Sequence, residues 1–309
     1  MVVEEATQEP SRNLTDGQVP SWLAAHGIPG IVDVHVHFLP PRIQAAVWAQ
    51  FDEAGPKIGR KWPITYRGSV EERIEQLRAL GVRRFGALPY AHKPGIAEYL
   101  NDWAGDLADG VPEVLRSATF YPEPEAAAYV ARRIEAGTEV FKVHVQVGEF
   151  DVRDELLDPV WAQLAETGTP IVLHAGSGPV GNAYTGPGPV REVLERHPQL
   201  ALVMAHSGAP EFEPFLAMAE DFEHVTLDTT MVFTDFFDAL GGAFPEVLLP
   251  RYEELGRAGK VLFGSDFPTI PYEFAHQLES LERLGFGDEW LRTVIWDAPA
   301  SRFARSLSD

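Results

Sequence analysis

Short apolar stretches alternate with longer amphipathic segments along most of this sequence, beginning at Ile31. The amphipathic segments carry apolar residues at helical spacing, whereas the apolar stretches have the length of buried strands. Alternation of this kind is typical of repeated βα units on a parallel sheet. The apolar stretches are residues 31–37, 82–90, 114–120, 139–145, 170–175, 200–206, 224–229 and 260–266. Eight such strands predict an α/β protein with a closed (β/α)8 TIM barrel.

Local signals support helices between these strands. Ser69 and Glu72 have the spacing of a capping box, and Gly81 supplies a C-terminal stop. Further helices are expected over residues 154–168, 189–198 and 272–285, and a last helix at the C-terminus. Two connections are much longer than the others, residues 38–66 after the first strand and residues 230–258 after the seventh. Long loops at these places usually cover the mouth of a barrel.

Length and composition fit one large domain. A barrel of about 250 residues with extensions accounts for a chain of 309 residues. The sequence is 45% hydrophobic, which is enough apolar material for a sizeable core. Residues 1–20 are polar and show no periodicity, so we expect a flexible N-terminal extension there and a single barrel domain over residues 21–309.

The charge and the absence of cysteine narrow the function. With 25 basic and 46 acidic residues the net charge is −21, which disfavours nucleic acid and anionic membranes as partners. The chain has no cysteine, so a transition metal would have to be bound through His, Asp or Glu. No run of membrane-spanning length and no signal-peptide pattern is present, so we expect a cytoplasmic protein.

Polar side chains gather where the predicted strands end. His35 and His37 are two residues apart on one strand, so both leave the same face. His174, His206 and Asp266 close three further apolar runs. Because the carboxyl ends of barrel strands meet at one mouth, these five residues predict a metal site there. Three imidazoles and one carboxylate suit Zn²⁺, and less well Mn²⁺ or Fe²⁺, with one position left open for water.

Six segments together resemble the amidohydrolase superfamily. They are DVHVHFLPP, FKVHV, LDPVWAQLAETGTPIVLHAGSG, VLERHPQLALVMAHSG, VTLDT and VLFGSDFP. The sequence is most similar to the amidohydrolase-related branch, which includes 2-amino-3-carboxymuconate-6-semialdehyde decarboxylase and other aromatic-acid decarboxylases beside hydrolases. The resemblance implies that one divalent ion is held by His35, His37, His174 and Asp266, with His206 near the activated water.

Catalytic and substrate-binding roles follow from this resemblance and from the chemistry of the residue types. His206 and Asp266 are the candidates for moving protons. Lys142 could bridge a second metal, as a carboxylated lysine does in some amidohydrolases, although its FKVHV setting is similar to the single-metal branch. The candidate substrate contacts are Arg42, Tyr90, His92, Lys142 and His144.

Three functions remain open at this level. The preferred one is a metal-dependent hydrolase in which metal-bound water attacks the carbonyl of an ester, lactone or amide. The alternative is a metal-dependent non-oxidative decarboxylase of a small aromatic or unsaturated carboxylic acid. The third is a non-catalytic barrel that binds a ligand or a protein partner. The two enzymatic functions imply a small-molecule substrate, and the resemblance suggests a homodimer.

Overall fold

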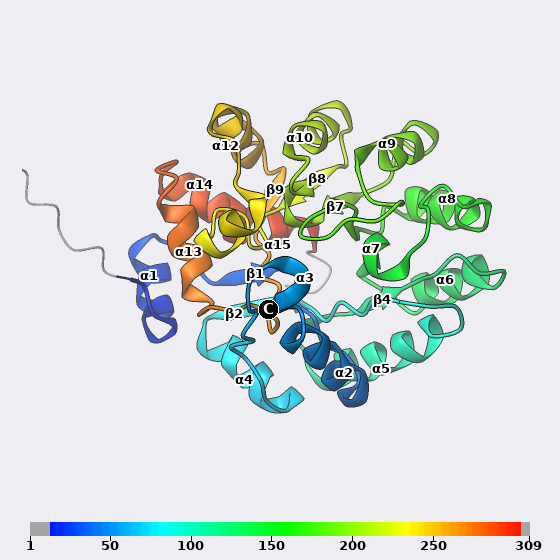
Figure 1. The fold of residues 1–309 in the computed structure, drawn as a ribbon, viewed down its shortest axis with the longest axis horizontal. Coiled ribbons are helices and arrows are strands. Elements are labelled where there is room, and N and C mark those ends of the chain that lie inside the picture. The colour runs from blue at the N-terminus through cyan, green and yellow to red at the C-terminus, as the bar shows by residue number, and fades with distance from the viewer. Residues whose placement is uncertain (1–12, 304–309) are drawn as a thin grey trace, which may run out of the picture.

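The computed structural model describes residues 13–303 and shows parallel strands enclosed by helices (Figure 1). The strands are β1 (Ile31–Asp33), β2 (Val82–Gly86), β3 (Val114–Leu115), β4 (Ser117–Thr119), β5 (Val140–His144), β6 (Ile171–His174), β7 (Leu202–Met204), β8 (Thr226–Asp228) and β9 (Val261–Leu262). Each of the eight predicted strands has a counterpart. The third is divided, because β3 and β4 both lie within residues 114–120.

The strands pair as β1-β2-β3 and as β4-β5-β6-β7-β8-β9, and every pairing is parallel. Three backbone hydrogen bonds join the first and last strand segments. The Val34 amide donates to the Phe263 carbonyl at 3.0 Å, the Asp266 amide to the His35 carbonyl at 2.8 Å, and the His37 amide to the Phe267 carbonyl at 2.7 Å. The predicted TIM barrel is thereby confirmed. Its parallel order brings the carboxyl ends of all strands to one face.

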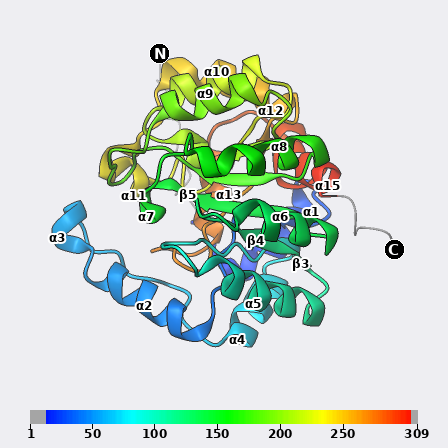
Figure 2. The ribbon, with the colours of Figure 1, turned by 90° about the vertical axis from the view of Figure 1, so that its right-hand side faces the viewer.

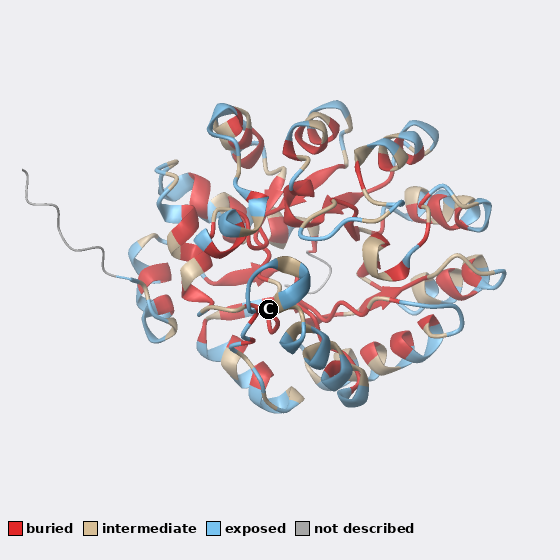
Figure 3. Ribbon diagram, viewed as in Figure 1, coloured by how far each residue is buried: buried red, intermediate tan, exposed pale blue. Residues whose placement is uncertain are grey.

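Helices surround the strands, and their outer surfaces are exposed while the strands are buried (Figure 3). The longer helices are α1 (Val19–Ala25), α2 (Pro41–Asp52), α4 (Val70–Ala79), α5 (Ala97–Gly110), α6 (Ala126–Glu135), α8 (Asp158–Thr167), α9 (Pro187–Arg196), α10 (Phe212–Asp221), α12 (Leu249–Arg257) and α13 (Ala275–Glu282). The shorter helices are α3 (Gly55–Ile58), α7 (Val145–Gly148), α11 (Asp235–Phe237), α14 (Asp288–Arg292) and α15 (Ala298–Arg302). The 3₁₀ and π turns are η1 (Asp16–Gln18), η2 (Glu155–Leu157), η3 (Ala205–Gly208), η4 (Asp238–Gly242), η5 (Glu246–Leu248) and η6 (Thr293–Asp297). No helix within residues 13–303 has both the length and the apolar character needed to cross a bilayer.

The local signals read from the sequence act as expected at α4. The Ser69 side chain accepts from the Glu72 amide at 3.2 Å, and the Glu72 carboxylate accepts from the Ser69 amide at 2.8 Å. The two long connections contain helices: α2 and α3 lie between β1 and β2, and α11, η4, η5 and α12 lie between β8 and β9. Figure 2 shows α2 and α3 as an arm beside the barrel.

The inner face of the barrel changes from apolar to polar along β5 and β6. On β5, Val140 belongs to an apolar cluster to which most strands contribute, and Lys142 and His144 follow at two-residue intervals. On β6, Val172 lies in the same cluster and His174 follows it. Since alternate residues of a strand share a face, the apolar residues fill one end of the barrel and the polar residues meet at the other.

The beginning of the described chain corrects one prediction. We expected residues 1–20 to be a flexible extension, but residues 13–20 form η1 and the start of α1, and Val19 is fully buried. The Asp16 carboxylate accepts from the Tyr66 hydroxyl and, at 2.9 Å, from the Ala275 amide. These tertiary hydrogen bonds order a polar segment that has no periodicity of its own. Residues 1–12 lie outside the described residues.

The role of this segment in stability can be measured. We expect Asp16→Ala to lower the free energy of unfolding by about 1–3 kcal/mol, because the half-buried Tyr66 hydroxyl and Ala275 amide lose their acceptor. Asp52→Ala is the control, since the exposed ion pair of Asp52 with Arg67 is worth only about 0–1 kcal/mol. Urea unfolding compares the two variants. Equal losses would show that the hydrogen bonds of Asp16 stabilise the fold no more than an exposed ion pair does.

Candidate metal centre

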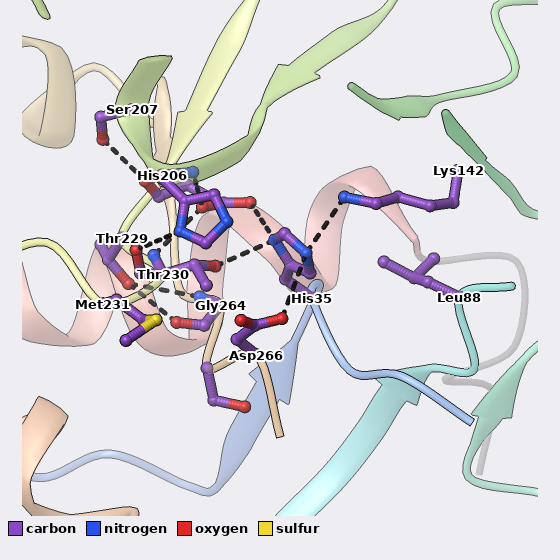
Figure 4. A network of polar contacts seen from close by, with 12 residues as sticks. His35, Leu88, Lys142, His206, Ser207, Thr229, Thr230, Met231, Gly264 and Asp266 are labelled. Carbon is purple, nitrogen blue, oxygen red and sulfur yellow. Dashed lines mark hydrogen bonds and ion pairs between the residues drawn. The ribbon is translucent and has the colours of Figure 1, made fainter. Parts of the chain in front are cut away.

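Three side chains meet at the carboxyl ends of the first and last barrel strands. His35 Nε2 lies 3.2 Å from His37 Nε2, and Asp266 Oδ1 lies 3.1 Å from His37 Nε2 and 3.8 Å from His35 Nε2. We refer to these three residues as the ligand cluster. Within residues 13–303 it is the only group of three or more His, Asp or Glu side chains compact enough to hold one ion. Figure 4 shows His35 and Asp266 facing one another.

The protons of both imidazoles are placed by partners on the far side of each ring. His35 Nδ1 lies 2.8 Å from Asp228 Oδ2, and His37 Nδ1 lies 2.8 Å from the carbonyl oxygen of Leu88. A carboxylate and a carbonyl can only accept, so each Nδ1 carries the hydrogen. Both Nε2 atoms therefore face Asp266, and each offers a lone pair to an ion when its ring is neutral. Partners of this kind orient histidine ligands in metal sites.

The donor set fits a divalent cation. Two imidazole lone pairs and a carboxylate oxygen converge, and like partial charges this close require a proton or a cation between them. Ligand atoms at about 2.0–2.1 Å from a tetrahedral ion are about 3.3 Å apart, close to the separations of 3.1–3.8 Å in the cluster. His35, His37 and Asp266 could therefore hold one ion without a change of fold.

Asp266 is the acidic member of the ligand cluster. Burial acts to raise its pKa, but the hydrogen bond with His37 and the neighbouring imidazoles lower the pKa to about 2. Its backbone has a φ of 66°, and its amide donates to the His35 carbonyl at 2.8 Å. The hydrogen bond to the first strand holds Asp266 in this uncommon conformation. The carboxylate is thus ionised and fixed beside both histidines.

His206 lies next to the cluster and outside it. Its ring centroid is 5.3 Å from that of His35, and its Nδ1 lies 3.0 Å from the Thr230 carbonyl oxygen. Because that oxygen only accepts, Nδ1 carries the hydrogen and Nε2 has a free lone pair when the ring is neutral. Burial holds the pKa of His206 below its usual value. The Phe237 ring covers His206, with centroids 6.0 Å apart.

His174, the predicted fourth ligand, lies beside the ligand cluster. Its nitrogen atoms are not part of the ligand cluster, and its Nε2 lies 3.4 Å from the Gly178 carbonyl oxygen. The ring stacks on His144 at a centroid distance of 3.9 Å and lies 4.8 Å from the His206 ring. The order of the strands places His174 near the ligand cluster, but its contacts with Gly178 and His144 orient its nitrogen atoms away from Asp266. Its role as fourth ligand stays a prediction.

The five predicted substrate contacts divide into two groups. Lys142 Nζ lies 3.1 Å from His35 Nε2, and burial lowers its pKa to about 8 against the opposing effect of two aspartates. Tyr90 packs its ring against both His37 and His144. By contrast, the residues His92 and Arg42 are exposed, and no contact among the described residues joins either one to the ligand cluster.

The partners of the Nδ1 atoms of His35, His37 and His206 could not be identified from the sequence. Asp228 lies at the end of the apolar run of residues 224–229 and is fully buried behind His35. In the sequence Asp228 and Asp266 look alike, because each ends a predicted strand. Only the folded structure shows that Asp228 lies behind His35 and that Asp266 faces the Nε2 side of the histidines. The carbonyl groups of Leu88 and Thr230 act through backbone atoms, so their side chains gave no signal.

Comparison with known proteins identifies the family and agrees with the barrel fold. The sequence profile of the amidohydrolase family matches residues 32–303. An uncharacterised TIM-barrel protein from Bordetella bronchiseptica is similar in fold, with a TM-score of 0.68, 17% identity, and coverage of 89% of this chain and 100% of the other. A search of the curated proteins finds no match.

Two further similar structures have names that indicate an activity. One is a 5-carboxyvanillate decarboxylase from Novosphingobium aromaticivorans solved with manganese and 4-hydroxy-3-methoxy-5-nitrobenzoic acid, with a TM-score of 0.61, 13% identity, and coverage of 96% and 100% of the two chains. The other is a probable 2-pyrone-4,6-dicarboxylic acid hydrolase from Acinetobacter baumannii, with a TM-score of 0.59, 13% identity, and coverage of 89% and 99%. At this identity the likeness shows the fold. Together with the family match over most of its length, the barrel and its histidine-rich mouth show that the chain belongs to the amidohydrolase family.

Proposed function

We propose that this protein is a hydrolase dependent on one divalent metal ion, which cleaves an ester, lactone or amide. The ion is held by His35, His37 and Asp266, and His174 completes the site by turning away from the Gly178 carbonyl. Nitrogen and oxygen ligands of this kind suit Zn²⁺, with Mn²⁺ or Fe²⁺ as alternatives. An ion bound there would polarise a carbonyl and lower the pKa of a water molecule.

The observation that carries the proposal is the state of His206. Its Nδ1 hydrogen is engaged by the Thr230 carbonyl, and burial lowers the pKa of the ring, so Nε2 is an unprotonated base at neutral pH. Hydrolysis requires a group that accepts a proton from the attacking water. His206 Nε2 is the group that accepts it, and the Asp266 carboxylate orients the water beside the carbonyl.

Decarboxylation is the second candidate, and Lys142 is the observation that favours it. Lys142 is a buried cation beside the ligand cluster and could pair with a substrate carboxylate. However, protonation of the substrate carbon requires an acid at the moment of reaction, and both His206 and Asp266 are unprotonated at neutral pH. Lys142, whose pKa is about 8, would then have to supply the proton.

A screen over lactones, esters, amides and aromatic carboxylates separates these reactions. We expect the metal-loaded protein to release acid from a carbonyl substrate without carbon dioxide, because a base and a water are the reacting groups. In ¹⁸O-labelled water one label should enter the product carboxylate. The chelator-treated protein is the control. Carbon dioxide release, with deuterium from D₂O bound to product carbon, would instead establish the decarboxylase.

A further inference from the structure

One short segment at the end of β8 contacts both His35 and His206. Asp228 Oδ2 lies 2.8 Å from His35 Nδ1, and Asp228 Oδ1 accepts from the backbone amide of His206 at 2.8 Å. Thr230 adds its Oγ1 at 3.1 Å from His35 Nδ1 and its carbonyl oxygen at 3.0 Å from His206 Nδ1. Figure 4 shows Thr230 between the two imidazoles.

Two independent partners assign the same tautomer to His35. Asp228 Oδ2 accepts from Nδ1, whereas Lys142 Nζ, which has hydrogens to donate, lies 3.1 Å from Nε2. The hydrogen is therefore on Nδ1, and the Nε2 lone pair is directed toward Asp266. Reversing the tautomer would place a hydrogen where the ion binds. His35 can serve as a ligand through Nε2 only while an acceptor remains behind Nδ1.

The same carboxylate restrains the backbone that carries His206. His206 and Ser207 have φ values of 54° and 50°, a conformation that costs free energy in residues other than glycine. Asp228 Oδ1 accepts from the His206 amide, and the Asp228 carbonyl accepts from Ser207 Oγ at 2.6 Å. Asp228 also accepts from the Thr230 amide at 3.0 Å, which fixes the orientation of its own side chain.

We propose that Asp228 is a positioning residue that fixes the tautomer of His35 and the place of His206 together. One buried carboxylate thereby orients the proposed metal ligand His35 and holds the backbone of the proposed base His206, so that the two imidazoles keep their relative positions. The inference rests on the proposed function for the role of His206. Its effect on His35 concerns metal binding alone and holds whichever reaction the site performs.

Asp228→Asn tests the proposal with a nearly isosteric change. The amide oxygen can still accept from the His206 and Thr230 amides, but the NH₂ group faces His35 Nδ1 and donates to it. The hydrogen of His35 must then move to Nε2. We expect the affinity for Zn²⁺, measured against a chelating indicator, to fall about 10- to 100-fold.

Nitrogen-15 NMR of the metal-free protein provides a readout that a merely structural role would not change. We expect the Nδ1–H tautomer of His35 in the wild type, the Nε2–H tautomer in Asp228→Asn, and a return of the Nδ1–H tautomer in Asp228→Glu. Thr226→Val is the matched control, because it removes a buried hydrogen bond of the same strand, to the Leu202 carbonyl, and touches neither histidine. It should leave Zn²⁺ affinity and tautomer unchanged.

Either of two results would overturn the inference. The first is an Nε2–H tautomer of His35 in the metal-free wild type, which needs no variant to fold. The second is wild-type Zn²⁺ affinity in Asp228→Asn. Failure of the proposed hydrolase activity is distinct from both, because neither affinity nor tautomer depends on turnover.

Discussion

His35→Ala is expected to reduce bound metal from about one ion per chain to a trace, and to lower kcat/KM about a thousandfold or more. The variant removes one of three converging lone pairs and leaves the Asp228 carboxylate without its imidazole partner. A bound ion stabilises the transition state by several kcal/mol, and each 1.36 kcal/mol is a factor of ten in rate. Elemental analysis after dialysis and steady-state kinetics measure the two effects.

A matched control distinguishes metal loss from general damage. His92→Ala replaces an exposed histidine of the same mouth that contacts no member of the ligand cluster. It should keep its metal and its folded circular dichroism spectrum, and any change in KM would then test the predicted substrate contact. If His35→Ala retains a full equivalent of metal while folded, His35 is not a ligand.

His206→Asn is expected to lower kcat about 10²- to 10⁴-fold while the metal content stays at the wild-type level. Asparagine suits this position because it tolerates the left-handed backbone conformation of His206 better than alanine does. The loss falls on kcat because the side chain acts on the proton of the attacking water and not on the ion. Rapid-quench or steady-state kinetics with the metal-loaded variant give the value.

The pH profile provides the second half of this test. The His206 pKa is lowered by burial, so the neutral base is present at neutral pH and is lost as the pH falls through that lowered pKa. Wild-type kcat/KM should therefore rise with pH below about 6.5, the ordinary value for histidine, and then level off. The variant should lack this acidic limb. An unchanged limb in His206→Asn would assign the titration to another group.

The sequence was sufficient to locate the ligand cluster because two simple rules act together. Alternate residues of a strand share a face, which pairs His35 with His37, and parallel strands end at one mouth, which brings Asp266 to both. Neither rule depends on details of packing. The capping box at Ser69 was readable for the same reason, since its donor and acceptor are three residues apart.

Features that depend on distant contacts could not be read in this way. The direction of the His174 nitrogens depends on the Gly178 carbonyl and on stacking with His144. Asp16 and Tyr66 are 50 residues apart, so nothing local indicated that the polar N-terminal segment docks on the barrel. Asp228 and Asp266 look alike at the ends of two strands, yet one is buried behind a histidine and the other faces the mouth.

Anomalous X-ray diffraction from a crystal grown with Zn²⁺ tests the metal centre most directly. One strong peak is expected about 2.0–2.2 Å from His35 Nε2, His37 Nε2 and an oxygen of Asp266, within reach of His174. His206 is expected to stay outside the coordination sphere. A peak at another place in the barrel, or none at full Zn²⁺ saturation, would contradict the proposed site.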